Sequence, residues 1–299
     1  MSMQYVAVTE SDIGISKNVN QDSVLIKHAT YAGSEILMAI IADGMGGLAK
    51  GEVASAAVIH RFNNWFANEL PQELKRIDMR VIGGKWSLML KELNIEIQEY
   101  GNRLKEKLGT TFTGLLIINN QFVTVHIGDT RLYYIGEAIE QLTNDHTFVA
   151  REVREGNLTP EEAKIDRRRN MLLQCVGASK CIEPDVFYGE VKQGVYMLCS
   201  DGFRHKISKE EIYSLFNFKS IKTKQLMFEK IHKSIEIVKQ RGEKDNISVI
   251  LIRSLPIMNK REKDSKKLIN KFKYKKVCIA AIALLIIGIA LLIFGMLFI

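Results

Sequence analysis

Five aspartates of this sequence stand where apolar stretches begin or end, and three of them have a glycine beside them. The five residues are Asp22, Asp43, Asp129, Asp201 and Asp245. Apolar stretches of this length are typical of β-strands, so each carboxylate would lie at the end of a strand. A single Asp-Gly pair is often only a turn. Five acidic residues at strand ends are not explained by turns or core packing, and strand ends on one side of a sheet would bring them together.

Such a group of carboxylates has a simple chemical interpretation. Carboxylates crowded at a desolvated strand end repel one another, which raises their pKa values and destabilises the fold unless cations neutralise them. Mg²⁺ and Mn²⁺ prefer oxygen ligands, and they usually take only a few of these ligands from the protein. Two such ions about 3.5–4 Å apart lower the pKa of a water and hold a phosphoryl oxygen during phosphoester hydrolysis. Gly44 has no Cβ, so its backbone carbonyl could approach an ion.

The apolar periodicity predicts the elements that position these residues. Short apolar stretches bounded by turn residues indicate strands, and longer amphipathic stretches indicate helices. The strands cover about residues 4–9, 22–28, 35–42, 111–119, 121–127, 131–135, 138–142, 185–191, 195–200 and 246–253, and the helices about 50–69, 86–107, 208–217 and 222–241. Strands that enclose pairs of helices indicate an α+β domain with mostly antiparallel sheets. The irregular stretch 145–180 is expected to be a small helical insertion.

Composition and charge limit the class of protein. Of the 299 residues, 46% are hydrophobic and 25% are charged, which is typical of a globular protein and excludes a wholly disordered chain. Most of the formal net charge of +8 comes from residues 257–276, where nine lysines and arginines stand against two acidic residues. The remainder is nearly neutral, so no nucleic-acid partner is predicted. The four cysteines lack Cys-x-x-Cys spacing, which disfavours disulfides or a zinc site and indicates a reducing compartment.

The apolar stretch 277–299 carries no charge and would form a helix roughly 34 Å long. This length is enough to cross a bilayer, and the basic residues before it are typical of a cytoplasmic linker that attracts anionic lipid. The alternative, a buried core helix, is less compatible with the cationic residues at its start. No cationic stretch followed by an apolar one opens the sequence, so no cleaved signal is expected. We therefore expect a single-pass C-terminal anchor in the cell membrane, with the rest of the chain cytoplasmic.

Seven short motifs occur in a fixed order along the chain. They are Asn20-x-Asp22, Ala42-Asp43-Gly44-Met45-Gly46-Gly47, Gly109-Thr110-Thr111, Gly128-Asp129-Thr130-Arg131, Leu142-Thr143-Asn144-Asp145-His146, Cys199-Ser200-Asp201-Gly202 and Asp245-Asn246. Together they closely resemble the PPM family of metal-dependent serine/threonine protein phosphatases, also called type 2C, in its bacterial form. The resemblance covers about residues 4–254. Each motif alone is weak evidence, whereas seven in this order are specific.

The resemblance implies both a fold and a metal centre. The fold is a β-sandwich of two antiparallel sheets flanked by pairs of helices, with a dinuclear Mn²⁺ or Mg²⁺ centre at one end. By match to the family motifs, Asp43 bridges the two ions and the carbonyl of Gly44 binds the first. Asp201 and Asp245 match ligands of the second ion.

The same match assigns further residues. Asp22 matches the acidic position that holds metal-bound water, and Asp129 matches a ligand of the third, weaker ion of the family. Lys17 stands where the family often has an arginine that grips the phosphate, so the charge is kept but the bidentate fork is lost. The segment about 147–180 corresponds to the variable flap, a place for substrate selection. Within it, Asp166 stands where bacterial relatives often have histidine.

The sequence therefore predicts a phosphatase domain over residues 1–255, a basic juxtamembrane linker over 256–276 and a transmembrane helix over 277–299. The predicted activity is hydrolysis of phosphoserine and phosphothreonine in proteins at the cytoplasmic face of a membrane, without a phosphoenzyme. The expected partners are phosphorylated proteins, a serine/threonine protein kinase and membrane lipid. One alternative is a non-catalytic pseudophosphatase that binds phosphoproteins. Another, a structural calcium-binding protein, is disfavoured because the aspartates do not form one contiguous loop.

Overall fold

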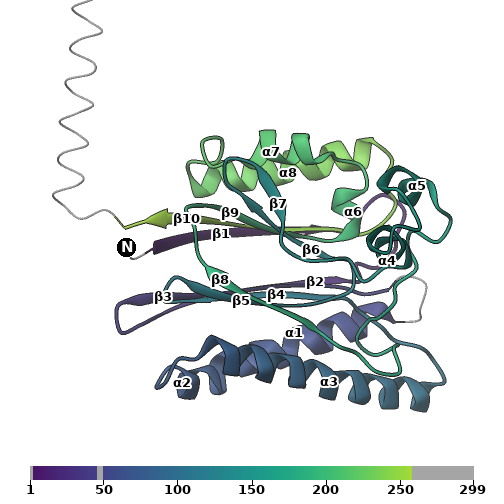
Figure 1. Ribbon diagram of the computed structural model, residues 1–299, viewed down its shortest axis with the longest axis horizontal. Coiled ribbons are helices and arrows are strands. Elements are labelled where there is room, and N and C mark those ends of the chain that lie inside the picture. The colour runs from purple at the N-terminus through teal and green to yellow at the C-terminus, as the bar shows by residue number, and fades with distance from the viewer. Residues whose placement is uncertain (1–2, 46–49, 258–299) are drawn as a thin grey trace, which may run out of the picture. The chain divides into compact units, whose positions relative to one another are not determined.

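The computed structural model describes residues 3–45 and 50–257. Within these residues, ten strands form two five-stranded antiparallel sheets that stack face to face (Figure 1). The first sheet has the order β2-β3-β4-β5-β8, with strands at Asp22–Tyr31, Ser34–Asp43, Phe112–Ile118, Gln121–Ile127 and Asp185–Glu190. The second sheet has the order β1-β10-β9-β6-β7, with strands at Met3–Asp12, Ile247–Pro256, Gly194–Cys199, Arg131–Ile135 and Ile139–Gln141. The predicted α+β class with antiparallel sheets is confirmed.

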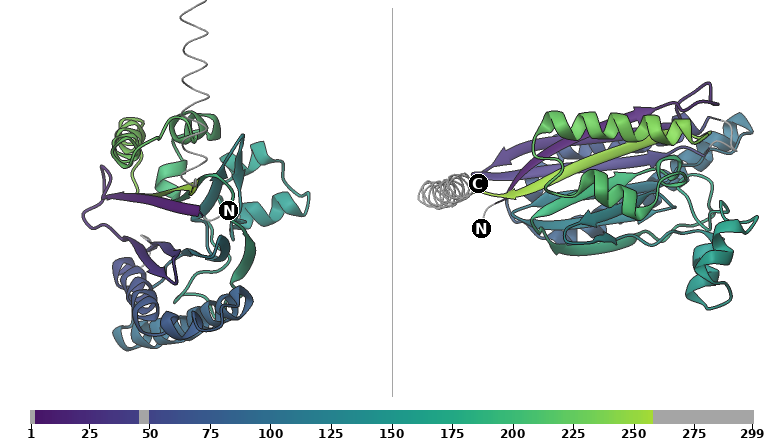
Figure 2. Two further views of the ribbon diagram at one scale, coloured as in Figure 1. Left: turned by 90° about the vertical axis from the view of Figure 1, so that its left-hand side faces the viewer. Right: turned by 90° about the horizontal axis from the view of Figure 1, so that it is seen from above.

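Helices cover the outer face of each sheet (Figures 1 and 2). Those over the first sheet are α1 (Gly51–Asn68), α2 (Leu70–Glu73) and α3 (Met79–Leu104). Those over the second sheet are α6 (Asp201–Arg204), α7 (Lys209–Phe216) and α8 (Lys224–Gln240). Two short helices, α4 (Phe148–Arg154) and α5 (Pro160–Ile165), lie at one end of the sandwich. This is the two-sheet fold with flanking helices that the resemblance implied.

Strand β3 lies in the middle of the core, with both of its faces covered. Successive side chains of a strand point to opposite faces. One set packs with the residues of α1 and α3 (Ile36, Met38, Ile40), and the other packs between the two sheets (Leu37, Ala39, Ile41). Because neither face meets water between Ile36 and Ala42, the strand is apolar at each of these positions until it reaches Asp43.

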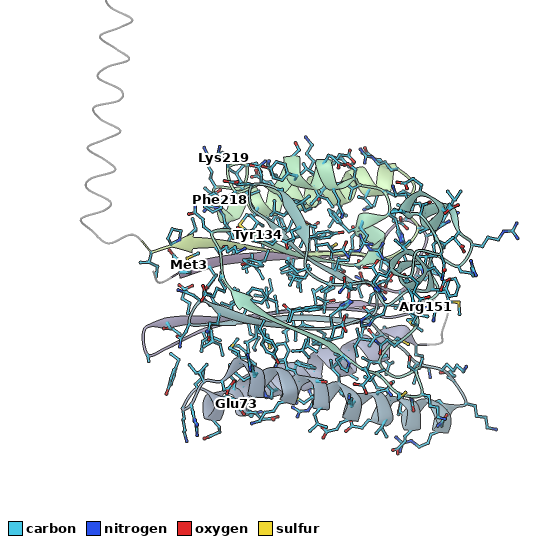
Figure 3. All side chains as sticks on the ribbon, in the orientation of Figure 1. Met3, Glu73, Tyr134, Arg151, Phe218 and Lys219 are labelled. Carbon is cyan, nitrogen blue, oxygen red and sulfur yellow. The ribbon has the colours of Figure 1, made fainter. Side chains whose placement is uncertain are left out.

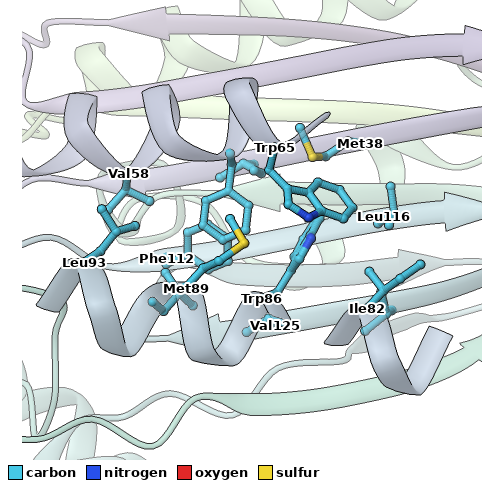
Figure 4. Packing of buried hydrophobic residues seen from close by; sticks show 14 of the residues in the cluster. Met38, Val58, Trp65, Ile82, Trp86, Met89, Leu93, Phe112, Leu116 and Val125 are labelled. Atoms are coloured by element: carbon cyan, nitrogen blue, oxygen red, sulfur yellow. The ribbon is translucent and has the colours of Figure 1, made fainter. Parts of the chain in front are cut away.

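Aromatic side chains pack against one another within the largely aliphatic core between the first sheet and its helices (Figure 4). Trp65 of α1 and Trp86 of α3 meet edge to face, with ring centroids 5.3 Å apart and an interplanar angle of 90°. This is a favoured arrangement of aromatic rings. The contact fixes α1, whose first residue, Gly51, packs so closely on Gly44 that a Cβ on Gly51 would lie 2.8 Å from the Gly44 carbonyl carbon. Core packing thereby supports the backbone of Gly44.

Helix α3 begins at Met79, seven residues before the predicted start at residue 86. The side chain of Asp78 caps it by accepting hydrogen bonds from the amides of Arg80 and Val81. The prediction was wrong because the pair Gly83-Gly84 has low helix propensity. Packing decides instead: a Cβ on Gly83 would lie 2.7 Å from the Tyr188 hydroxyl, so glycine lets the helix approach the sheet.

One compact unit spans Met1–Pro256. Almost all of the predicted linker and the whole of the predicted helix 277–299 lie outside the described residues, so the division into three regions stays a prediction. Within residues 3–45 and 50–257, no helix is both long and apolar enough to cross a membrane.

Candidate metal centre

The predicted aspartates lie at one end of the sandwich and come from both sheets. Antiparallel pairing of β2 with β3 puts Asp22 directly opposite Asp43 in the first sheet. In the second sheet, Asp201 follows β9 and Asp245 precedes β10, and these two strands pair with each other. Asp129 lies in the link from β5 to β6, where the chain passes from the first sheet to the second.

The electrostatics indicate that the carboxylates share one site. Burial is the main cause that raises the pKa of Asp43 well above its ordinary value of 3.8, and the charges of the other four predicted aspartates raise it further. Burial also raises the pKa of Asp22 to about 7 and that of Asp129 to about 6. The five groups therefore lie close enough to oppose one another's ionisation. Their individual roles as ligands stay predictions.

Several of these oxygens have no protein partner. Both carboxylate oxygens of Asp22 and Oδ1 of Asp201 are buried and accept no hydrogen bond from the described residues. The hydroxyls of Ser200 and Ser248 partly offset the rise in the pKa of Asp22, but neither hydroxyl is placed to donate a hydrogen bond to its carboxylate. A buried anionic oxygen without a partner is costly, and a cation would remove that cost. A donor set of carboxylates and a backbone carbonyl fits Mg²⁺ or Mn²⁺.

Backbone contacts hold Asp43 and Gly44 in place. The Asp43 amide donates to Thr111 Oγ1 at 2.9 Å, and the Thr111 amide donates to the Asp43 carbonyl at 2.9 Å. The Gly44 amide donates to the Gln21 carbonyl at 3.1 Å. In the part of the chain that the structure describes, no three His, Cys, Asp or Glu side chains form a complete metal site by themselves. A centre here would also need the Gly44 carbonyl and water, as is usual for Mg²⁺.

Two basic residues lie next to the predicted aspartates: Lys17, whose phosphate contact stays a prediction, and His205, which the sequence interpretation missed. Lys17 Nζ is 3.0 Å from Asp245 Oδ1. His205 lies between two carboxylates, with Nε2 3.6 Å from Asp201 Oδ2 and Nδ1 3.7 Å from Glu243 Oε2. Burial lowers the pKa of His205, but Glu243 and Asp201 outweigh it, so the pKa is raised. Its spacing of four residues after Asp201 was the available sequence signal.

Arg204 is a second residue that the sequence interpretation missed. Its Nη2 donates to Asp129 Oδ2 at 2.9 Å and to the Asp129 carbonyl at 3.2 Å. The same nitrogen lies 3.7 Å from Asp145 Oδ2. Asp145 is itself bound by Arg131, whose Nε and Nη2 donate to its two oxygens at 2.8 and 2.6 Å.

The segment predicted as the flap is organised around one aromatic ring. The guanidinium carbons of Arg168 and Arg151 lie 4.1 and 5.1 Å from the ring centroid of Phe148. Arg151 lies at the α4 and α5 end of the sandwich (Figure 3). Asp166 Oδ2 lies 2.8 Å from Arg168 Nη2, and hydrogen bonding to Arg168 lowers the pKa of Asp166 to about 2. Asp166 therefore has a structural role, because it fixes the arginine that covers Phe148.

Comparison with known proteins identifies a matching family. Residues 15–251 match the sequence profile of the family described as Protein phosphatase 2C. The chain is 33% identical over 252 residues to Serine/threonine protein phosphatase PstP of Mycobacterium tuberculosis, a match that covers 83% of this chain and 44% of PstP. It is 32% identical over 261 residues to Protein phosphatase PhpP of Streptococcus pneumoniae, covering 81% of this chain and 94% of PhpP. The chain thus spans less than half of PstP but nearly all of PhpP.

A solved structure extends the similarity to three dimensions. The catalytic domain of PstP in complex with two manganese ions aligns with this chain at a TM-score of 0.66 and 29% sequence identity. The alignment covers 85% of this chain and 100% of that domain.

Proposed function

The chain belongs to the protein phosphatase 2C family, and we propose that it hydrolyses phosphoserine and phosphothreonine in proteins at a dinuclear Mn²⁺ or Mg²⁺ centre. The observation that supports this most is the gathering of five carboxylates around Asp43, together with buried oxygens of Asp22 and Asp201 that lack a protein partner. Such a group is stable at neutral pH only with cations. The similarity to a domain that holds two manganese ions supports the choice of metal.

Each residue has a defined part in this proposal. Asp43, whose pKa is raised by the other four predicted aspartates, would bind both ions, and the Gly44 carbonyl would bind one of them. Asp201 and Asp245, which come from paired strands of the second sheet, would bind the other ion. When bound, the two ions supply a water of lowered pKa and polarise the phosphoryl oxygens. Asp22, whose oxygens accept no hydrogen bond from the described residues, would orient that water.

Lys17 would offset charge on the phosphoryl group. Its ammonium lies 3.0 Å from Asp245 Oδ1, next to a proposed ligand of the second ion. Lysine provides a point charge without the two-pronged geometry of arginine. The positive charge would therefore stabilise the transition state with little control over its orientation.

We also propose that the domain acts at the cytoplasmic face of a membrane, anchored by residues 277–299. The support is the sequence alone: an uncharged stretch of spanning length that follows the basic residues 257–276. A membrane-bound serine/threonine kinase would be a suitable counterpart, because tethering both enzymes raises their effective concentration for shared phosphoprotein substrates.

The function is tested by phosphate release from a phosphothreonine peptide and from an aryl phosphate, with the full chain and saturating Mn²⁺. Removing a residue that only supports a metal ligand usually lowers activity roughly 10–100-fold. We expect the activity of Asp43→Asn to fall by more than this. Its circular dichroism should be unchanged. Asp78→Asn is the matched control, because asparagine also caps a helix. Asp78 lines the same pocket as Gln121, which begins β5, whereas Asp129 follows the end of β5.

Two outcomes would contradict the proposal in different ways. Full activity of Asp43→Asn would refute the site. No turnover of any phosphopeptide by the unmodified chain would favour the non-catalytic, phosphoprotein-binding alternative.

A further inference from the structure

We infer that Arg204 serves as a built-in cation for Asp129 and keeps this carboxylate out of metal ligation, so that the centre holds two ions and no third. The inference rests on the proposed dinuclear centre and concerns one side of it. It departs from the family match, in which Asp129 corresponds to a ligand of a third ion.

The contact between the two residues is close and doubly anchored. Arg204 Nη2 donates both to Asp129 Oδ2, at 2.9 Å, and to the backbone carbonyl of Asp129, at 3.2 Å. The two side chains are only 14% and 10% exposed, so water screens the pair little. The guanidinium therefore occupies space beside the carboxylate that a ligated ion and its waters would need.

The neighbouring carboxylate cannot easily take Arg204 away from Asp129. Asp145 already accepts two hydrogen bonds from Arg131, one on each oxygen, and a third from Gln141 Nε2 at 3.2 Å. Arg204 lies farther from it, with 3.7 Å between Nη2 and Asp145 Oδ2. Asp129 is thus the carboxylate that depends on Arg204 for its neutralisation.

The short helix α6 fixes the arginine in this position. Phe203, the residue before Arg204, is fully buried in the core. Gly202 packs against the chain before β10, where a Cβ would lie 2.1 Å from the Asn246 carbonyl oxygen. Both contacts hold the backbone of α6, and therefore the Cα of Arg204, close to Asp129 and to Asp201 at the start of the same helix.

The positive charge of Arg204 disfavours a metal ion on Asp129. Arginine stays protonated at any physiological pH, so its positive charge is permanent. A divalent cation on Asp129 would lie next to this charge in a poorly solvated place, where like charges repel strongly. Asp129 therefore acts as the counter-ion of Arg204, and the Arg204 side chain supplies the neutralisation that a further metal ion would otherwise provide.

The test counts bound Mn²⁺ per chain by titration calorimetry and by electron paramagnetic resonance of the unbound ion, using the full-length protein. We expect Arg204→Met, which keeps an unbranched apolar stem but removes the guanidinium and its charge, to bind one ion more than the unmodified chain. Arg204→Lys, which keeps the charge, should bind none more. Arg61→Gln is the control for loss of one positive charge elsewhere, because Arg61 forms an exposed ion pair with Glu69; its count should equal that of the unmodified chain.

A second comparison does not depend on the folding of any Arg204 variant. We expect Asp129→Asn to bind as many ions as the unmodified chain. Loss of one ion in Asp129→Asn, an unchanged count in Arg204→Met, or an extra ion in Arg204→Lys would each overturn the inference. The proposed function fails separately, if the unmodified chain binds fewer than two ions.

Discussion

Asp22 and Asp43 face each other across the β2–β3 ladder, where Asp22 begins one strand and Asp43 ends the other. Opposed residues in an antiparallel pair have Cα atoms only about 4.5–5.5 Å apart. The charge of Asp22 raises the pKa of the buried Asp43, so the pair is stable only when it is protonated or bound to cations. The pairing therefore couples the stability of the fold to both pH and metal.

The metal-free protein should lose stability as the pH rises from about 4 to about 7. In the folded state burial raises the pKa of Asp22 from 3.8 to about 7 and that of Asp129 to about 6, so the folded chain holds protons that the unfolded chain releases. Mn²⁺ competes with the protons on Asp22 and Asp43, so its stabilising effect should grow over the same range. Melting temperatures measured in EDTA and in saturating Mn²⁺ check this. An equal Mn²⁺-induced shift at about pH 5 and about pH 8 would contradict it.

Gly14 should matter for metal binding, whereas Gly33 should not. Both have a φ of +79°, which glycine adopts without strain. A Cβ on Gly14 would lie 2.2 Å from the Asp245 carbonyl oxygen, whereas none of the described atoms lies within 4 Å of a Cβ on Gly33. Gly33→Ala should cost about 1–2 kcal/mol of unfolding free energy from its conformation alone. Gly14→Ala should cost more and also weaken Mn²⁺ binding, because Asp245 must move.

Denaturant unfolding and calorimetric titration with Mn²⁺ measure the two effects separately. If both alanine variants bound Mn²⁺ as the unmodified chain does, Gly14 would have no part in positioning Asp245.

Lys17 should act on the phosphate and not on the fold. Its ion pair with Asp245 has side chains that are 30% and 42% exposed, and such pairs contribute only about 0–1 kcal/mol. Lys17→Met should therefore unfold at nearly the same denaturant concentration, while its kcat/KM falls about 10–100-fold from loss of a charged hydrogen bond. Lys17→Arg should keep or raise kcat/KM because a guanidinium can bind phosphate through two donors. A similar loss in both variants would argue against phosphate contact.

His205 should help to orient Asp201, a proposed ligand of the second ion. It lies between Asp201 and Glu243, so its removal frees the Asp201 carboxylate to turn. His205→Gln should weaken Mn²⁺ binding about 10–100-fold, as is usual for a residue that orients a ligand. His232→Gln is the matched control, because His232 also pairs with a carboxylate, Glu10, but on the exposed face of α8. Equal Mn²⁺ affinities of the two variants would show that His205 does not orient Asp201.

The sequence predicted the strands around the site well, for a physical reason. Where a strand is covered on both faces, as β3 is from Ile36 to Ala42, it must be apolar, so the change to a charged residue at Asp43 marks the point where the chain leaves the core. The antiparallel class and the end of the sandwich where the carboxylates gather followed from such transitions. The motifs around these points made the family recognisable.

Contacts between distant residues could not be predicted in this way. Arg204 and Asp129 are 75 residues apart, and their pairing depends on how the single turn of α6 is oriented by Phe203 in the core. The early start of α3 likewise depends on how closely Gly83 approaches Tyr188. Both contacts result from packing in three dimensions, and neither produces a periodic pattern of apolar residues in the sequence.

The acidic residues are divided between two separate sheets, so the apolar layer between those sheets sets the distance between the carboxylates. Leu37 on one sheet, and Tyr196 and Ile250 on the other, belong to that layer. If a smaller side chain there let one sheet slide slightly over the other, the distance between opposing carboxylates would change before the protein melted. Selection for catalytic turnover would then act on apolar residues that never touch substrate. Substitutions in the layer between the sheets would lower catalysis without unfolding the protein.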